Sequence, residues 1–155
     1  MKRPKITLVV ETPAWRSSKT LPAMLKRAAL LVLGHVGARA CEVTILLADD
    51  ARLRDLNAQF RRLDKPTNVL SFPALENDEN HLGDVAIAYG VTAREAKDAG
   101  KSLSHHATHL AVHGVLHLLG YDHETSRDAR KMERLEIEIL TALKIPDPYI
   151  SRKAA

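Results

Sequence analysis

The chain has 155 residues, 45% of them hydrophobic and 27% charged, which is enough to form one domain with a substantial core. The longest apolar stretch, residues 28–34, is far shorter than the roughly 20 residues that cross a bilayer, and no signal peptide is recognised, so we expect a cytoplasmic protein that does not contact membranes. The net charge of +4 is uneven, since residues 1–65 carry 13 Lys and Arg against 6 Asp and Glu. This excess is compatible with a polyanionic partner and equally with a solvated basic surface, so charge alone does not decide between them.

The first half of the chain predicts a strand, a helix and a second strand. Residues 5–11 and 41–48 are rich in β-branched and apolar side chains, which is typical of buried strands. The spacing between them predicts a helix that Thr20 caps and that Gly34 or Gly37 ends. Cys41, at the start of the second strand, is expected to be a small core residue, and as the single cysteine it excludes an internal disulfide.

The middle of the chain predicts one more helix and two more strands. Residues 49–60 form an amphipathic pattern with an aspartate cap, and Phe60 is expected on its apolar face. Residues 61–73 predict a turn followed by a short strand, and residues 82–90 predict the next strand. The acidic and polar residues 74–81 between them are expected to form a mobile loop.

The last third predicts helices. The helical pattern begins at Thr92, breaks near Gly100 and resumes over residues 102–119, and a final amphipathic helix covers residues 126–143. We therefore predict an α+β fold over residues 1–155, a single domain in which a mixed sheet of about four strands packs with about five helices.

Three histidines fall within the eleven residues HGVLHLLGYDH, residues 113–123. His113 and His117 are four residues apart, so on a helix they project from one face. Gly120 allows the positive φ that turns the chain away from the helix, which lets His123 return to the same point. Three neutral imidazoles with an open fourth position are typical of catalytic zinc, and the sequence predicts one zinc ion per chain at the end of a helix.

The spacing HxxxHxxGxxH is also that of the metzincin proteases, in which a glutamate follows the first histidine as general base. Here that residue is Gly114. Because glycine cannot accept a proton, the pattern keeps the metal site but weakens the peptidase interpretation.

The same motif, together with LNAQFRRLDKPTNVLSFP (residues 56–73) and LGDVAIA (residues 82–88), resembles the YbeY-type rRNA maturation factors. The order and separation of these blocks and the chain length match that family, whereas the first forty residues and the acidic loop add little to the likeness. The resemblance implies a zinc-dependent endoribonuclease that cleaves single-stranded RNA in rRNA maturation, including 16S rRNA processing, and in ribosome quality control. It implies rRNA and ribosomal subunits as partners.

The resemblance also implies that His113, His117 and His123 are the zinc ligands and that Arg61 matches a functionally important arginine. A planar guanidinium suits this role, because it holds a phosphate through two hydrogen bonds and stabilises developing negative charge.

Four further residues are weaker candidates. Arg62 and Lys65 are expected to position RNA phosphates, and Asp84 and Asp122 are expected to orient ligand imidazoles, although a turn explains Asp122 almost as well. His109, one turn before the motif, is expected to be an ordinary core or surface histidine.

Three interpretations compete at this point. The first is the zinc-dependent endoribonuclease. The second is a non-catalytic RNA-binding ribosome-assembly factor with a structural zinc, and an open ligand position disfavours it. The third is a zinc amide hydrolase, which Gly114 weakens.

Overall fold

The computed structural model describes residues 3–38, 40–75, 77 and 80–150. It contains four strands, five α-helices and one short 3₁₀ helix within these residues. In chain order the elements are β1 (Lys5–Val10), η1 (Pro13–Ser17), α1 (Leu21–His35), β2 (Glu42–Ala48), α2 (Asp50–Arg61), β3 (Val69–Pro73), β4 (His81–Ala88), α3 (Tyr89–Asp98), α4 (Leu103–Leu118) and α5 (Ser126–Ala142). The predicted α+β class and the numbers of strands and helices are confirmed. No described helix is long and apolar enough to cross a membrane.

The four strands form one mixed sheet in the order β1-β2-β4-β3. β1 pairs with β2 and β2 pairs with β4 in parallel, whereas β3 pairs with β4 in the antiparallel direction. β3 therefore forms one edge of the sheet, and this edge borders the functional site described below.

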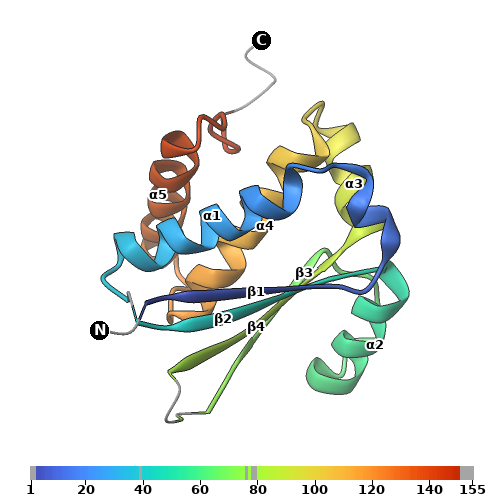
Figure 1. The fold of residues 1–155 in the computed structure, drawn as a ribbon, viewed down its shortest axis with the longest axis horizontal. Helices are drawn as coiled ribbons and strands as arrows, with labels where there is room; N and C mark the ends of the chain where they lie inside the picture. Colours follow the sequence, from blue (N-terminus) through green and yellow to red (C-terminus); the bar gives the residue numbers. More distant parts are fainter. Residues whose placement is uncertain (1–2, 39, 76, 78–79, 151–155) are drawn as a thin grey trace.

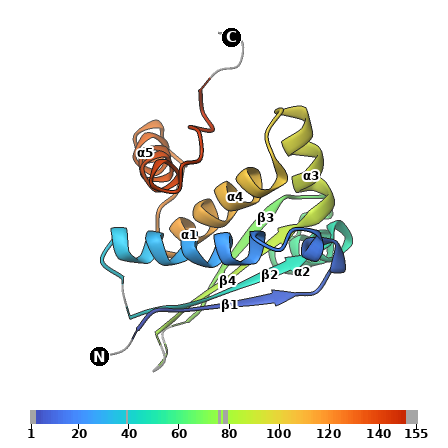
Figure 2. The same cartoon turned by 45° about the horizontal axis from the view of Figure 1, so that its top comes forward.

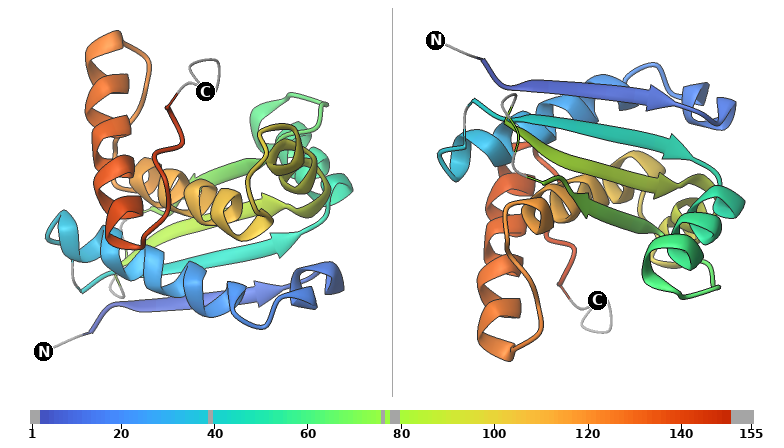
Figure 3. Two further views of the ribbon diagram at one scale, coloured as in Figure 1. Left: turned by 90° about the horizontal axis from the view of Figure 1, so that it is seen from above. Right: turned by 90° about the horizontal axis from the view of Figure 1, so that it is seen from below.

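The helices cover the two faces of the sheet unequally (Figures 1 and 2). α1 and α4 lie against one face, and α5 packs on the outer side of both. α2 lies on the opposite face, at the end where α3 begins, so that much of this face stays open (Figure 3, right). The main core lies between the sheet and the pair α1 and α4, and its fully buried side chains include Leu25, Ile45, Ile87 and Leu116.

Two of the expected helix ends are confirmed. Gly37 ends α1 with a φ of +77°, and the next residue, Ala38, donates its N–H to the Leu33 carbonyl at 2.8 Å. This is the Schellman arrangement that a glycine beyond a helix end favours. Asp49 caps α2, because its side chain accepts a hydrogen bond from the Arg52 N–H at 2.8 Å.

Several details differ from the sequence-based predictions. Thr20 precedes α1 but makes no capping bond, because its backbone is already helical (φ −91°, ψ −20°). Phe60 does not join the core and is 61% exposed, since α2 covers only part of its sheet face. β4 ends at Ala88, and α3 begins at Tyr89 rather than at Thr92.

Two further expectations concerned Cys41 and the acidic loop at residues 74–81. Cys41 is half-buried and packs against the core. Residues 76, 78 and 79 of the expected mobile loop lie outside the described residues.

Candidate metal centre

The first two histidines of the motif lie on α4, which approaches the sheet closely at Gly114. A Cβ atom at Gly114 would lie 2.6 Å from Val85 Cγ1 on β4, and the Gly114 carbonyl accepts a hydrogen bond from Ser71 Oγ on β3 at 2.9 Å. Residue 114 therefore faces the sheet, and any side chain there would push the helix away. The glycine that weakens the peptidase interpretation is thus required by the packing of α4.

The three histidines meet where α4 ends. Gly120, with a φ of +96°, turns the chain back so that His123 returns to the other two, as expected. The ring centroids of His113 and His117 are 4.5 Å apart, and the His123 ring lies 5.6 Å and 5.2 Å from them. One nitrogen from each ring lies within 4.8 Å of the others.

This arrangement fits a metal ion. The Nε2 atoms of His113 and His117 are 3.0 Å apart, close to the roughly 3.3 Å between two nitrogen ligands of one tetrahedral zinc. Burial, together with the nearby His113 and His123, lowers the pKa of His117 and so favours the neutral form that binds metals. The three histidines are positioned to bind one metal ion.

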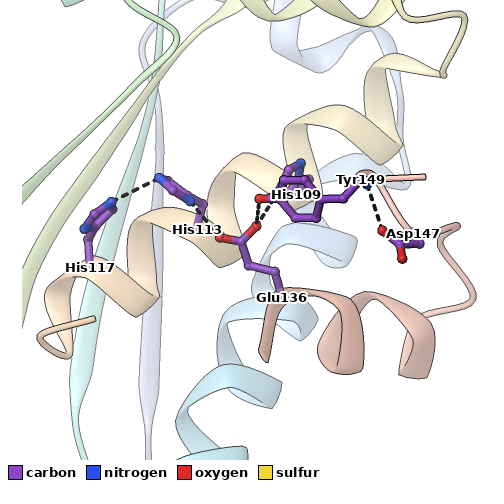
Figure 4. A network of polar contacts seen from close by, with 6 residues as sticks. All are labelled: His109, His113, His117, Glu136, Asp147 and Tyr149. Carbon is purple, nitrogen blue, oxygen red and sulfur yellow. Dashed lines mark hydrogen bonds and ion pairs between the residues drawn. The ribbon is translucent and has the colours of Figure 1, made fainter. Parts of the chain in front are cut away.

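The sequence-based prediction missed the carboxylate behind these ligands, Glu136 on α5. Its side chain is 1% exposed, and its Oε2 accepts a hydrogen bond from His113 Nδ1 at 2.7 Å (Figure 4). Burial by itself would raise the pKa of Glu136, but hydrogen bonds from His109, His113 and Tyr149 outweigh it and lower the pKa to about 2. The sequence did hold a signal that could have identified Glu136. This glutamate lies four residues after Met132, on the apolar face of the predicted helix, where a charged side chain is unexpected.

The two aspartates that were expected to orient ligands have other partners. Asp84 lies on β4 at the open face of the sheet, and its carboxylate pairs with His81 at 3.1 Å. Asp122 accepts a hydrogen bond from the Glu124 N–H at 3.3 Å, which is the turn interaction noted as the alternative. Among the described contacts, Glu136 rather than either aspartate binds a ligand imidazole.

A cavity of about 380 Å³ lies between the histidines and the edge strand β3. Arg61, the last residue of α2, borders this cavity together with all three histidines. Arg61 is exposed, and it belongs to none of the ion pairs found among the described residues. The geometry therefore places a free guanidinium beside the candidate metal centre. The other lining residues are Asn68, Val69, Ser71 and Pro73.

Arg62 and Lys65 are exposed in the turn that follows α2, and neither belongs to the described lining of this cavity. Arg62 ends the helix in a left-handed conformation (φ +56°). The Lys65 carbonyl accepts a hydrogen bond from the buried Asn57 side chain at 3.1 Å, which fixes the turn. Neither side chain belongs to an ion pair found among the described residues.

A second groove, of about 760 Å³, runs over the open face of the sheet beside α2. It shares Arg61, Ser71 and Pro73 with the cavity at the histidines, so the two hollows meet at the edge strand β3. The rings of Phe60 and Phe72 line this groove with their centroids 5.2 Å apart.

The fold and this site define an α+β protein whose three-histidine centre is positioned for one metal ion. Residues 13–144 match the protein family described as Endoribonuclease YbeY. The Endoribonuclease YbeY of Rhodopseudomonas palustris (strain BisA53) is 46% identical over 161 residues, which cover 98% of this chain and 94% of that protein. The one from Chelativorans sp. (strain BNC1) is 47% identical over 150 residues, covering 93% and 92%. The chain belongs to the YbeY endoribonuclease family.

A solved structure supports the fold separately. The solution structure of TM1509 from Thermotoga maritima matches with a TM-score of 0.60 and covers 97% of this chain and 99% of that chain. Its sequence identity is 24%, so this likeness concerns the fold alone.

Proposed function

We propose that the chain is a zinc-dependent, single-strand-specific endoribonuclease domain that acts in rRNA maturation, including 16S rRNA processing, and in ribosome quality control. The observation that carries this proposal is the shared cavity, which brings Arg61 from α2 and the three histidines from α4 and the following turn to one place. Family membership supports RNA as the substrate. The proposal adds that this RNA is rRNA and that the partners are ribosomal subunits in the cytoplasm.

His113, His117 and His123 would hold one zinc ion, since three neutral imidazoles at one point are a common catalytic donor set. When bound, zinc supplies a Lewis acid and activates water near neutral pH. Glu136 Oε2 lies 2.7 Å from His113 Nδ1, and the other ring nitrogen of His113, Nε2, lies 3.0 Å from His117 Nε2.

Arg61 would bind the scissile phosphate. Its guanidinium offers two parallel N–H donors to phosphate oxygens and adds positive charge where negative charge develops during cleavage. Gly114 occupies the position at which metzincins carry the glutamate base. The described residues that border the cavity therefore offer no general base of the metzincin kind. Arg61 should therefore be essential for the rate.

The groove beside the cavity supports the proposed preference for single strands. Phe60 is 61% exposed next to Arg61, and an exposed aromatic ring beside a basic side chain suits a base and its phosphate. Bases are free to stack on such a ring only when they are not paired in a duplex.

The experiment compares Arg61→Ala with Arg134→Ala, an exposed arginine on α5. At matched zinc content, Arg61→Ala should lose about a hundredfold or more of the cleavage rate on a labelled single-stranded RNA, because one charge at the reacting phosphate is removed. Zinc binding and fold should be retained, and Arg134→Ala should cleave at the wild-type rate. An unchanged rate in Arg61→Ala would rule out this role and favour the non-catalytic RNA-binding alternative.

A further inference from the structure

Glu136 is the only fully buried carboxylate among the described residues, and it lies between Met132 and Leu140 on the apolar face of α5. A carboxylate without partners is costly to bury, so its surroundings must supply donors. Three donors reach it from two other parts of the chain. His113 Nδ1 binds Oε2 at 2.7 Å, and His109 Nε2 binds Oε1 at 2.6 Å. The Tyr149 hydroxyl also donates to Oε1.

Figure 4 shows that these groups form a continuous chain of contacts, here called the Glu136 cluster (His109, His113, Glu136 and Tyr149). Its inner end is a candidate metal ligand, and its outer end is the segment after α5. There Ile145 is 5% exposed and packs into the core. The Asp147 side chain accepts a hydrogen bond from the Tyr149 N–H at 2.7 Å, which forms the turn that brings the Tyr149 ring back to α4.

The contacts assign the protons of this cluster. A carboxylate oxygen accepts a hydrogen bond, so the 2.7 Å contact between His113 Nδ1 and Glu136 Oε2 places the proton of His113 on Nδ1. The other nitrogen, Nε2, then carries the lone pair, and this atom lies within hydrogen-bond distance of His117 Nε2, at 3.0 Å. The tautomer that Glu136 selects is therefore the one in which His113 can bind a metal ion through Nε2.

We propose that Glu136 and Tyr149 are positioning residues of the metal centre: Glu136 selects the tautomer and orientation of His113, and the Tyr149 hydroxyl holds Glu136 in place. The turn at residues 147–149 is thereby a functional part of the site, although it lies 24 or more residues beyond His123 in the sequence. This inference rests on the proposed function only in taking the three histidines as metal ligands.

The test uses Glu136→Gln and Tyr149→Phe in the full chain. Their matched controls are Glu138→Gln, an exposed glutamate on the same helix, and Tyr89→Phe, whose ring packs on Trp15. The first readout is the protonation of His113 in zinc-free protein, measured from the ¹⁵N chemical shifts of its two ring nitrogens. The second readout is zinc affinity, measured by competition with a coloured chelator.

Wild-type protein should show His113 protonated on Nδ1. Glu136→Gln should raise the Nε2-protonated population, because an amide N–H can donate to Nδ1, and should weaken zinc binding about 10- to 100-fold. Tyr149→Phe should weaken it about three- to tenfold, since it removes one donor to the carboxylate. Both controls should match the wild type in both readouts.

A merely structural role for the cluster would change stability but not the His113 tautomer or the zinc affinity of the folded protein. Wild-type values for both readouts in folded Glu136→Gln would therefore overturn the proposal, and unchanged zinc affinity in Tyr149→Phe would overturn the role of the C-terminal turn. If Glu136→Gln does not fold, the Tyr149→Phe result decides. If wild-type protein binds no zinc, the proposed function fails, and the tautomer still decides whether Glu136 positions His113.

Discussion

Gly114 connects the chemistry of the site with the packing of the fold. It follows the ligand His113, and its Cα faces Val85 and Ser71 on the sheet rather than the cavity. The close approach that its missing side chain permits lets the Ser71 hydroxyl bind the Gly114 carbonyl. Gly114 therefore has two consequences. It leaves the site without the glutamate that metzincins carry at this position, and it sets the distance between α4 and the edge strand.

Replacement of this glycine by alanine tests the packing directly. Gly114→Ala should destabilise the protein by about 1–3 kcal/mol, because the added Cβ would lie 2.6 Å from Val85 Cγ1 in a closely packed region. Gly34→Ala on α1 is the control, since no atom lies within 4 Å of its added Cβ, and it should stabilise the helix by about 0.5–1 kcal/mol. Urea unfolding measures both. Equal effects in the two variants would contradict the close contact.

At the scale of the elements, α3 and α4 meet through a histidine, His106, whose side chain is 11% exposed. Burial lowers the pKa of His106 on α4, and this outweighs the hydrogen bond to Glu95 on α3, which acts in the opposite direction. Electrostatic interactions with the neighbouring Lys101 and His109 lower the pKa of His106 further. The folded chain therefore releases the His106 proton more readily than the unfolded chain does.

This difference predicts a loss of stability in mild acid. The contribution of His106 is complete above the unfolded pKa of about 6.5 and declines as the pH falls towards the lower pKa of the folded state. The loss is at most about 1.4 kcal/mol per pH unit for one group. His106→Gln in zinc-free protein should lose less stability than the wild type between about pH 7.5 and about pH 5.5. Identical losses, measured by urea unfolding, would show that His106 does not titrate differently on folding.

Local signals and distant contacts explain which elements the sequence predicted well. The helices with a local cap, such as α2 with Asp49, begin close to the predicted residue. The start of α3 was placed three residues late, because its cap comes from Asp50, whose Oδ1 accepts a hydrogen bond from the Val91 N–H at 2.9 Å across 41 residues. No pattern within residues 82–92 contains that information.

The same distinction applies to the site. The three histidines were predicted together because they lie within eleven residues, and helix geometry with one glycine turn brings them to one point. Glu136 was missed because its partners, His113 and Tyr149, lie 23 and 13 residues away, and only the packing of α5 on α4 brings them together. The placement of Arg61 at the cavity likewise required the tertiary fold.

At the scale of the whole molecule, the groove over the open face of the sheet and the basic N-terminal half favour binding of a polyanionic strand. Residues 1–65 hold 13 Lys and Arg against 6 Asp and Glu, and the groove receives Arg52, Phe60 and Arg61 from this half. Phosphate contacts release counterions, so binding should weaken steeply with salt.

Binding measurements on a fluorescent RNA test this surface. Single-stranded RNA should bind more tightly than a duplex, and the affinity should fall as salt rises. Phe60→Ala should weaken single-strand binding about five- to hundredfold, because a stacking platform is lost. Leu30→Ala, an exposed apolar residue on α1, is the control. A flat response to salt, or wild-type affinity in Phe60→Ala, would exclude the groove as the path of the RNA.

The most direct test of the proposed chemistry is a cleavage assay. The purified chain is given an end-labelled single-stranded RNA before and after removal of its metal. The zinc-loaded wild type should cleave, lose its activity when a chelator has removed the zinc, and recover it when zinc is returned. His117→Ala, prepared identically, should remain inactive throughout, because one of the three converging nitrogens is absent. Cleavage that continues at the same rate without zinc, and that His117→Ala shares, would contradict a metal-dependent ribonuclease built on these histidines.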